Sequence, residues 1–416
     1  MRILHVNKFP YRRGGAEAYM LDLARLQRER GDDVAFFGMQ HPDNDPQPYA
    51  DHFPSRVEFE PPPSSVFGKA RSAARMFWST SAAHGIDAVL TDFEPDVVHL
   101  HNIYHHLSPS ILRPVAARRV AAVMTLHDYK LACPTYQFLD KGELCQACLG
   151  GHFSQAPRRR CKDGSLAAST LAAAELGLHT RMHAYAPVSR FVCPSHFMAD
   201  TMARAGVFPD RLRHLPHFAD IAAVPPAGEP GRGIAVACRL SPEKGVDVLI
   251  DAVGRMAAGV TLDVAGEGPE LPALRTRAEA VAPGRVTFHG RLPGPQVQQL
   301  LRGAAVAAVP SRWYENQPMI VLEAFACGTP VVASDLGGAG ELIAPGTDGA
   351  LVPANDPAAL AAAIEPFVAD PIRARAMGRA GRTKVEVEFS PERHLHGLDE
   401  VYAEATTAAG RSRVGT

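Results

Sequence analysis

The sequence predicts an α/β protein of two Rossmann-like, doubly wound domains that face each other across a cleft. Short apolar runs alternate with helical patterns along the chain, which favours parallel sheets built from βαβ units. A stretch rich in proline and glycine, 224–233, interrupts this alternation near the middle of the chain. At 416 residues the chain is also too long for one ordinary hydrophobic core.

The first half predicts an N-terminal domain, 1–220, whose first strand leads through Gly14-Gly15 into a helix near 16–30. The expected strands of this domain are 3–7, 32–38, 96–101, 121–127, 189–195 and 212–217. Several of these runs end in polar residues. Ligands of parallel sheets bind beyond the carboxyl ends of the strands, so these polar ends are candidate site positions.

The second half predicts a linker at 221–232, a C-terminal domain at 233–385 and a terminal segment at 386–416. The expected strands of the C-terminal domain are 233–240, 260–268, 286–292, 306–311 and 329–334. Each is short and apolar and is followed by glycine, proline or a helical pattern. Two such domains would hold a ligand in the cleft between them.

Composition narrows the class of protein. Apolar residues make up 46% of the chain and charged residues 21%, and the formal net charge is −1. Nothing therefore draws the whole protein to nucleic acid, and we expect at most peripheral membrane contact. The opening residues MRILHVNKFP have the pattern of a strand and not of a signal peptide, which predicts a cytoplasmic protein.

The segment 310–334 places two glutamates at informative positions. Glu315 stands just before a predicted helix and Glu323 lies inside it, eight residues later, so their backbones are roughly 12 Å apart. That separation is too long for two carboxylates that flank one glycosidic bond, since retaining hydrolases place them about 5 Å apart. It does suit the two ends of one extended ligand.

Local signals set the ends of the same helix. Asn316 or Gln317 is expected to cap it, and Pro318 is preorganised for its first turn. Gly328 suits the position after the last turn, and Pro330 prevents continuation. The helix is therefore predicted to run through MIVLEAFAC.

An ordered set of short motifs runs through the chain: Gly14-Gly15, HDY at 127–129, RLSPEKG at 239–245, GEGP at 266–269, GRLP at 290–293 and the Glu315–Glu323 segment. As a set they resemble the retaining GT-B glycosyltransferases, in particular glycosyltransferase family 4 with its E-x7-E signature. The resemblance implies a donor site in the C-terminal domain. It also implies that a last helix, near 392–408, returns to the N-terminal domain.

The resemblance assigns roles around the two glutamates. Glu323 is expected to accept hydrogen bonds from both ribose hydroxyls of a nucleotide-sugar donor, and Glu315 to contact the transferred sugar. Backbone groups around Asn316, Gln317 and Pro318 are expected to surround the sugar and phosphates at a helix N-terminus, which favours negative charge. Relatives often have glycine and an aromatic residue where this chain has Asn316-Gln317.

Arg239 and Lys244 lie in RLSPEKG, between a strand and a helix. Two cations and a helix N-terminus could stabilise a departing diphosphate without a divalent ion, so we expect no catalytic metal. The resemblance implies that Gly14 and Gly15 complete the diphosphate pocket from the opposite domain.

The resemblance also implies nearby contacts on either side of the diphosphate. Backbone groups at Arg291 and Leu292 would contact the nucleobase. His127, at the end of a strand, would contact the donor sugar beside the reacting carbon. The implied reaction is transfer with retention through a front-face, ion-pair-like step in which the departing phosphate helps to deprotonate the acceptor.

A second polar cluster follows the strand at 96–101. His101, Asn102, His105 and the adjacent His106 would either line the acceptor site or form a surface loop.

Four cysteines fall within a short insertion after HDY, 133–161. Cys133, Cys145, Cys148 and Cys161 have the spacing C-x11-C-x2-C-x12-C. One CxxC and two outlying cysteines can supply a tetrahedral thiolate site, which predicts structural zinc, with reduced thiols, disulfides or an iron–sulfur cluster as alternatives. Similar insertions occur in a subset of the family. A site closed by four ligands is not expected to be catalytic.

The predicted function is therefore a glycosyltransferase that moves a sugar from a nucleotide-diphosphate donor, UDP ahead of GDP. The acceptor would be a saccharide, a lipid-linked molecule or a small molecule. Two alternatives are a nucleotide-sugar epimerase, which uses a similar cleft, and a catalytically silent module that binds nucleotide sugars.

Overall fold

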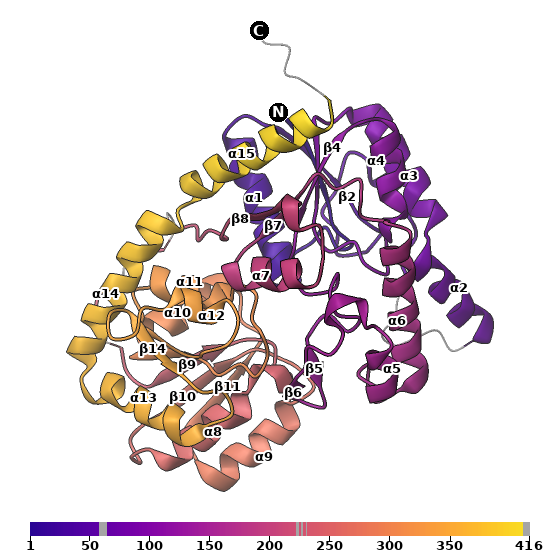
Figure 1. The fold of residues 1–416 in the computed structure, drawn as a ribbon. Helices are drawn as coiled ribbons and strands as arrows, with labels where there is room; N and C mark the ends of the chain where they lie inside the picture. Colours follow the sequence, from indigo (N-terminus) through magenta and orange to yellow (C-terminus); the bar gives the residue numbers. More distant parts are fainter. Residues whose placement is uncertain (58–64, 222–223, 226–227, 230, 411–416) are drawn as a thin grey trace.

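The computed structural model describes residues 1–57, 65–221, 224–225, 228–229 and 231–410. Parts of the predicted linker and of the terminal segment lie outside the described residues. Two six-stranded parallel sheets, each covered by helices, occupy the two halves of the chain (Figure 1). The fold is therefore the predicted one, GT-B, with two Rossmann-like doubly wound domains.

The N-terminal sheet has the strand order β2-β1-β3-β4-β7-β8. Its strands are β1 (Arg2–Val6), β2 (Asp33–Phe37), β3 (Val97–Leu100), β4 (Ala121–Thr125), β7 (Arg190–Cys193) and β8 (Leu212–His214). The helices of this half are α1 (Gly15–Glu29), α2 (Val66–Phe77), α3 (Thr80–Phe93), α4 (Leu112–Ala117), α5 (Gln155–Arg159), α6 (Leu166–Arg181) and α7 (His196–Arg204). A two-stranded hairpin, β5 (Leu139–Asp140) and β6 (Glu143–Leu144), lies in the cysteine-rich insertion.

The C-terminal sheet has the order β11-β10-β9-β12-β13-β14. Its strands are β9 (Ile234–Ala237), β10 (Leu262–Ala265), β11 (Val286–Gly290), β12 (Val306–Val309), β13 (Val331–Ser334) and β14 (Gly349–Val352). The helices that follow are α8 (Val246–Arg255), α9 (Leu271–Val281), α10 (Gly294–Gly303), α11 (Met319–Ala326), α12 (Ala339–Leu342), α13 (Pro357–Ala369), α14 (Pro371–Glu388) and α15 (Pro391–Ala408).

Burial explains why these short runs form strands. The central strands β4, β12 and β13 read AAVMT, VAAV and VVAS, and every residue in them is buried. Parallel strands with helices on both faces cannot alternate apolar and polar residues, so they appear as nearly continuous apolar runs. The serine and threonine that end two of these strands lie at the carboxyl edge.

Each sheet reverses its strand order at one point, where loops diverge to opposite faces. In the N-terminal sheet this switch point lies between β1 and β3. In the C-terminal sheet it lies between β9 and β12. The loops that follow these four strands contain most of the residues that the sequence motifs identify.

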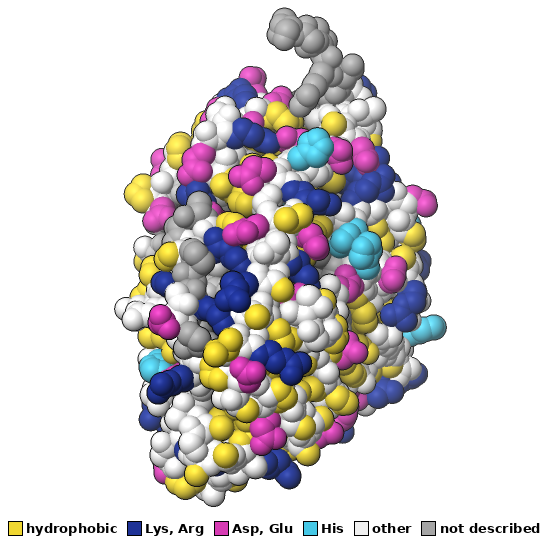
Figure 2. All heavy atoms as spheres, turned by 90° about the vertical axis from the view of Figure 1, so that its left-hand side faces the viewer, with side chains coloured by type: hydrophobic (Ala, Val, Ile, Leu, Met, Phe, Trp, Pro, Cys, Tyr) yellow, Lys and Arg dark blue, Asp and Glu magenta, His cyan; other side chains and the backbone are white. Residues whose placement is uncertain are grey.

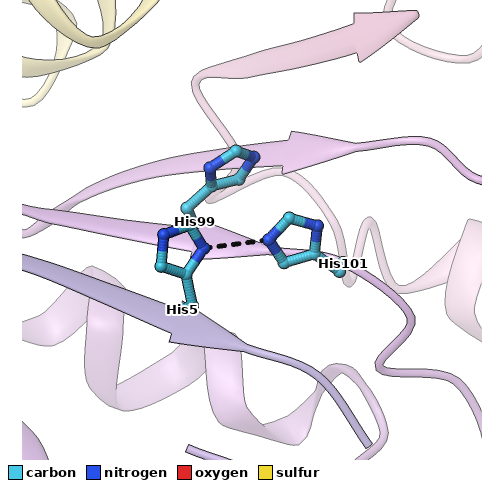
Figure 3. A group of neighbouring side chains, drawn as sticks. All are labelled: His5, His99 and His101. Atoms are coloured by element: carbon cyan, nitrogen blue, oxygen red, sulfur yellow. Dashed lines mark hydrogen bonds between the residues drawn. The ribbon is translucent and has the colours of Figure 1, made fainter. Parts of the chain in front are cut away.

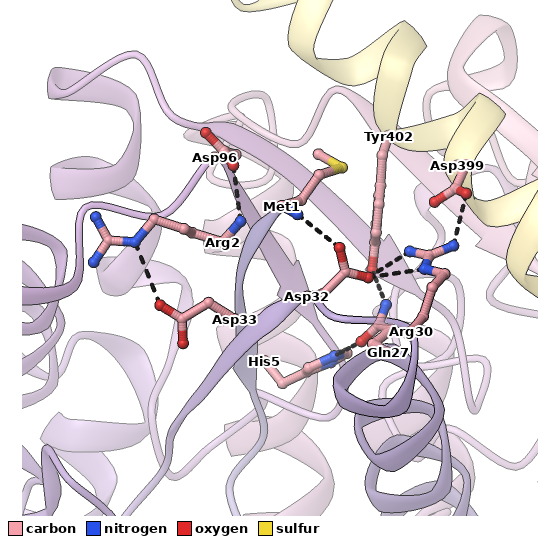
Figure 4. A network of polar contacts seen from close by, with 10 residues as sticks. All are labelled: Met1, Arg2, His5, Gln27, Arg30, Asp32, Asp33, Asp96, Asp399 and Tyr402. Carbon is pink, nitrogen blue, oxygen red and sulfur yellow. Dashed lines mark hydrogen bonds and ion pairs between the residues drawn. The ribbon is translucent and has the colours of Figure 1, made fainter.

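The last helix, α15, packs on the N-terminal sheet, against β4 and β7 (Figure 1). Leu398, Val401 and Tyr402 of α15 share one apolar cluster with Ile3 and Val97. The Tyr402 hydroxyl accepts from Gln27 Nε2 at 3.2 Å (Figure 4). It donates to His99 Nδ1 at 2.7 Å. The end of the chain is thus fixed to its beginning by burial and by a buried polar network.

The surface charges and the helix lengths bear on nucleic-acid binding and on membrane insertion. Acidic and basic side chains are mixed across the face shown in Figure 2. Within the described part of the chain, every helix is too short or too polar to cross a bilayer.

Replacing Tyr402 by phenylalanine should lower the free energy of unfolding by about 1–3 kcal/mol, because His99 Nδ1 and Gln27 Nε2 would remain buried without that partner. Denaturant unfolding followed by circular dichroism measures the effect. Asp399→Ala is the control. Its ion pair with Arg30 is partly exposed on the same face of α15 as Tyr402, so its loss should cost less than about 1 kcal/mol. Equal effects of the two variants would contradict the structural role given to the hydroxyl.

Candidate active site

Four polar residues gather beside the switch point of the C-terminal sheet. Arg239 and Lys244 lie in the loop after β9, and Ser311 and Glu315 lie in the loop after β12. Gly245 makes the approach of the two loops possible. It has φ 64°, and a Cβ added there would stand 2.0 Å from the carbonyl oxygen of Pro310.

Lys244 and Glu315 form an ion pair across these loops, with 2.7 Å between Nζ and Oε1. The Ser311 hydroxyl donates to the same oxygen at 2.6 Å. Burial acts to raise the pKa of Glu315, but the Lys244 ammonium and the hydrogen bonds to the carboxylate together outweigh it, so the net pKa is lowered. Glu315 in turn raises the pKa of Lys244 against the effect of burial. Both groups are therefore charged at neutral pH, although 71 residues separate them in sequence.

Arg239 differs from Lys244 in being exposed. Its guanidinium has no hydrogen-bond or ion-pair partner among the residues that the structure describes. An arginine in that state keeps all its donors available for an anion.

The helix with the second glutamate begins one residue later than expected, at Met319, with Pro318 as its N-cap residue. The predicted side-chain cap by Asn316 or Gln317 is wrong, because both amides bond to the other domain. Asn316 Nδ2 donates to the carbonyl oxygen of Leu126 at 2.9 Å. Gln317 Oε1 accepts from the backbone N–H of His217 at 2.6 Å. The tip of α11 therefore meets the N-terminal domain.

Glu323 lies on the accessible side of α11 while its neighbours Leu322 and Ala324 are buried. Surrounding protein and the Asp22 carboxylate raise the pKa of Glu323, and Arg12 opposes this shift. Arg12 and Asp22 belong to the N-terminal domain and pair with each other beside the start of α1. The charges that act on this carboxylate therefore come from the N-terminal domain.

The Gly14-Gly15 turn stands at the switch point of the N-terminal sheet, with Gly14 as the N-cap of α1. Gly14 has φ −150°, and a Cβ added at Gly15 would meet no atom within 4 Å. Neither a left-handed backbone nor internal packing therefore requires glycine at Gly15. Glycine at this position leaves the backbone open to close approach of a molecule from outside the chain.

A chain of buried hydrogen bonds ends at His127. Gln27 Nε2 donates to Tyr402, so Gln27 Oε1 accepts from His5 Nε2 at 2.7 Å. His5 Nδ1 then accepts from His101 Nε2, and His101 Nδ1 accepts from His127 Nε2, both at 3.0 Å. Burial keeps these rings neutral: it lowers the pKa of His5 to about 4 and that of His127 to about 3. His127 therefore carries its proton on Nε2 and leaves Nδ1 as an acceptor.

Three members of the surrounding cluster, His5, His99 and His101, have ligand nitrogens within 4.8 Å of one another (Figure 3). Their ring nitrogens already have protein partners. His99 bonds to Tyr402 and Thr125, and His5 and His101 use both nitrogens in the chain that ends at His127. A metal would have to break these bonds, so the arrangement is explained as a hydrogen-bond network.

The second polar cluster is not a surface loop. His101 is fully buried and cannot line an acceptor site, so that assignment is corrected: it supports His127. His105 is partly exposed, and its Nδ1 lies 3.0 Å from buried Glu175, which also pairs with Lys130. Asn102 remains a candidate for acceptor contact, because its Oδ1 is buried without a hydrogen-bond partner among the described residues.

The GRLP residues lie after β11, at the edge of the C-terminal sheet. Arg291 is exposed, and Leu292 lines a shallow groove with Asp263, His289 and one face of α10.

Sequence reasoning missed the loop after β13. Gly337 pairs with Glu315 and has φ 61°, and a Cβ on Gly338 would stand 1.8 Å from the carbonyl oxygen of Asn316. Glu341, just beyond, accepts from the backbone N–H groups of His196 and Phe197 in the other domain, at 2.8 and 2.6 Å. The signal was another Gly-Gly pair in a loop between a strand and a helix, as at Gly14-Gly15.

Buried polar atoms without a partner among the described residues collect at these loops. They include His217 Nδ1, Asn316 Oδ1 and Gln317 Nε2. Such atoms are costly, and native proteins keep few of them. The site therefore offers both donors and acceptors to a polar ligand.

Comparison with known families agrees with this geometry. Residues 13–223, just over half of the chain, match the model described as Glycosyltransferase Family 4, and residues 231–370 match Glycosyl transferases group 1. The chain belongs to glycosyltransferase family 4. The first match covers most of the N-terminal sheet and the second covers the C-terminal sheet. The gap between them, 224–230, lies in the region of the predicted linker.

Curated relatives in the family match part of the chain. An alpha-maltose-1-phosphate synthase of Mycolicibacterium smegmatis is 37% identical over 170 residues, which cover 38% of this chain and 44% of that one. A GDP-mannose-dependent monoacylated alpha-(1-6)-phosphatidylinositol monomannoside mannosyltransferase of Corynebacterium glutamicum is 35% identical over 204 residues, 44% of this chain and 53% of that one. The chain thus spans about half the length of these relatives.

Solved structures share the whole fold with this family member. Sucrose-phosphate synthase from Thermosynechococcus elongatus has a TM-score of 0.72 at 20% identity, covering 98% of this chain and 99% of that one. HepE of Anabaena, in complex with UDP, has a TM-score of 0.67 at 20% identity, covering 96% and 99%.

The buried histidines predict loss of stability on mild acidification. Their folded pKa values lie below the ordinary value near 6.5, so the unfolded chain binds more protons as pH falls below about 6.5. The free energy of unfolding should therefore be nearly constant above pH 7 and should decrease from pH 6.5 to 5. Urea unfolding at several pH values measures the slope.

His127→Gln should reduce that slope, whereas His396→Gln should not, since His396 is 80% exposed on α15. Stability that stays constant down to pH 5 in the unmodified protein would disprove neutral burial of the cluster.

Proposed function

We propose that the protein is a retaining glycosyltransferase that moves a sugar from a nucleotide-diphosphate donor to an acceptor hydroxyl without a catalytic metal. One observation supports it most: loops from the carboxyl edges of both sheets meet, with Lys244, Arg239 and Glu315 on one side and His127 and Gly14-Gly15 on the other. The family membership supports the same reading. Each role below belongs to this proposal.

The donor would extend along α11 and across the loops at its tip. Glu323 would accept from the ribose hydroxyls, and the backbone at Arg291 and Leu292 would contact the base. Lys244 and Arg239 would neutralise the diphosphate, with the Gly14-Gly15 backbone on its far side. Lys244 has three donors and gives one to Glu315, so it can bond the carboxylate and a phosphate together.

In the proposed step the bond between the sugar C1 and the bridging phosphate oxygen breaks, and its electron pair stays on that oxygen. The acceptor oxygen bonds to C1 from the same face, and its proton passes to the departing phosphate. The two cations stabilise the charge that develops on the leaving group. This route needs no nucleophile from the chain and retains the configuration at C1.

His127 would position the sugar. Its neutral Nδ1 can accept from a sugar hydroxyl near the reacting carbon, while Nε2 is committed to His101. Glu315 has Oε1 occupied by Lys244 and Ser311, which leaves Oε2 for another sugar hydroxyl.

UDP is the nucleotide that we propose, with a saccharide, lipid-linked or small-molecule acceptor. The solved HepE complex contains UDP, whereas the C. glutamicum relative is named for GDP-mannose, so GDP is the competing base. The cytoplasm, which holds nucleotide sugars, is the proposed compartment.

A panel of nucleoside diphosphates should separate these donors by thermal shift. A ligand that binds only the folded state stabilises it by RT ln(1 + [L]/Kd), about 2.7 kcal/mol at a hundred times Kd. UDP should raise the melting temperature more than GDP or ADP at equal concentration. A larger shift with GDP would reverse the base assignment, and no shift with any diphosphate would contradict a nucleotide-sugar site.

Two substitutions should separate donor binding from turnover. Glu323→Ala should weaken binding of the nucleotide diphosphate roughly tenfold to a hundredfold, because it removes charged hydrogen bonds to the ribose. Arg239→Ala should change that affinity less and lower kcat by about a hundredfold. Calorimetry and release of nucleotide from donor plus acceptor measure the two effects.

Glu279→Ala and Arg255→Ala are matched controls, since both residues are exposed on helices of the same domain. Unchanged affinity in Glu323→Ala would refute its role. Interconversion of free donor sugars, without sugar transfer to an acceptor, would instead indicate an epimerase.

A further inference from the structure

The four cysteines of the insertion come together in the folded chain. Cys133 lies in the turn after Tyr129, Cys145 directly follows β6, Cys148 is one turn later and Cys161 follows α5. All four are free thiols, and all four line one enclosed cavity of about 10 Å³. A cavity of that size has room for about one water molecule or one ion.

We propose that this cavity is a structural zinc site with Cys133, Cys145, Cys148 and Cys161 as its four ligands. Four thiolates and a closed coordination sphere are typical of structural zinc and exclude hard cations such as Mg²⁺. The proposal does not rest on the proposed transferase activity.

The insertion has little regular secondary structure. Its hairpin strands contain two residues each, α5 has five residues, and the strands are half-buried or exposed. Segments with so small an apolar core usually depend on a disulfide or a metal. The free energy of metal binding would here become free energy of folding for the insertion.

Contacts around the sulfurs fit metal-bound thiolates. The Thr135 hydroxyl lies within hydrogen-bond distance of the Cys133 sulfur, at 3.4 Å. Hydrogen bonds of this kind orient metal ligands. Four thiolates around Zn²⁺ also leave a net charge of −2. Arg159 lines the cavity, and the sequence places it in the basic run Arg158-Arg159-Arg160, which would offset that charge.

The sulfurs must close in when the metal binds. Within the described residues, only the His5, His99 and His101 group has three ligand atoms within 4.8 Å of one another. Sulfurs in a tetrahedral zinc site lie roughly 3.8 Å apart, as Zn–S bonds of about 2.3 Å require. Cys145, Cys148 and Cys161 lie in short turns outside the two large sheets, so these three sulfurs can approach Cys133 through movement of those turns.

The site would also support the loop that holds Glu315. Phe138, which lines the cavity, is fully buried against Tyr129, with 5.0 Å between ring centroids. It also contacts Tyr314 edge to face at 6.4 Å. Tyr314 directly precedes Glu315, and Tyr129 follows His127 by two residues. A metal that orders Phe138 would therefore stabilise a wall shared by both domains.

The test is metal analysis of the full-length protein, purified under reducing conditions without added chelator or metal. Elemental analysis should find about one zinc per chain. Each of Cys133→Ser, Cys145→Ser, Cys148→Ser and Cys161→Ser should reduce the zinc content at least fivefold. Cys327→Ala, at a buried cysteine of the C-terminal core, should retain it.

Two further measurements keep the result decisive if a serine variant folds poorly. Cobalt exchanged into the unmodified protein should show the thiolate charge-transfer absorption of a tetrahedral sulfur site. Chelation of zinc should make the segment 133–161 sensitive to limited proteolysis while the circular dichroism of the two domains changes little.

Several results would overturn the proposal. One is protein without bound metal whose four thiols react freely with a thiol reagent in the native state. Others are disulfides within the segment in the reduced preparation, or iron with acid-labile sulfide. Zinc that is lost in His5→Gln but kept in all four serine variants would place the metal at the histidines instead.

Discussion

Parallel strand pairing is the constraint on which the rest of the molecule depends. Because every strand of a sheet ends at the same edge, the loops after β9 and β12 meet, and so do those after β1 and β3. Lys244 and Glu315 form an ion pair because these loops meet, although 71 residues separate them in the sequence. The docking of α15 then fixes the N-terminal sheet that supplies the opposing loops.

The same constraint explains the histidine network and why sequence reasoning found only its end. His5 and His99 are register partners on neighbouring strands, and His101 lies two residues after His99, on the same side of the sheet. The spacing of two residues between His99 and His101, which places both on one side of a strand, was visible in the sequence. Which strands are neighbours was not, so His101 was expected either to line the acceptor site or to lie in a surface loop. Two side-chain hydrogen bonds and complete burial make it a support for His127 instead.

The features that could be predicted from the sequence depend on residues close together in the chain. Apolar runs predicted eleven of the strands of the two large sheets, and Gly328, at φ 71°, ends α11 as expected. What failed depended on distant partners. Asn316 is a good local cap, but a carbonyl of the other domain binds its amide. Helix α3 has a glycine in its middle because a Cβ on Gly85 would stand 2.1 Å from the carbonyl oxygen of His52. The strand β14 was missed because its run GALV is short and only partly buried.

The residues that join the two domains are polar, whereas the core of each domain is apolar. This polar boundary matters for the proposed transfer, because it can bind a sugar. Asn316 and Gln317 each use one side of the amide to hold the opposite domain, and the other side is buried without a partner among the described residues. Each such atom costs about 1–3 kcal/mol. A sugar hydroxyl both donates and accepts, so it can satisfy the Asn316 oxygen and the Gln317 nitrogen in turn. Under the proposed function, the two amides are therefore where this chain would contact the sugar.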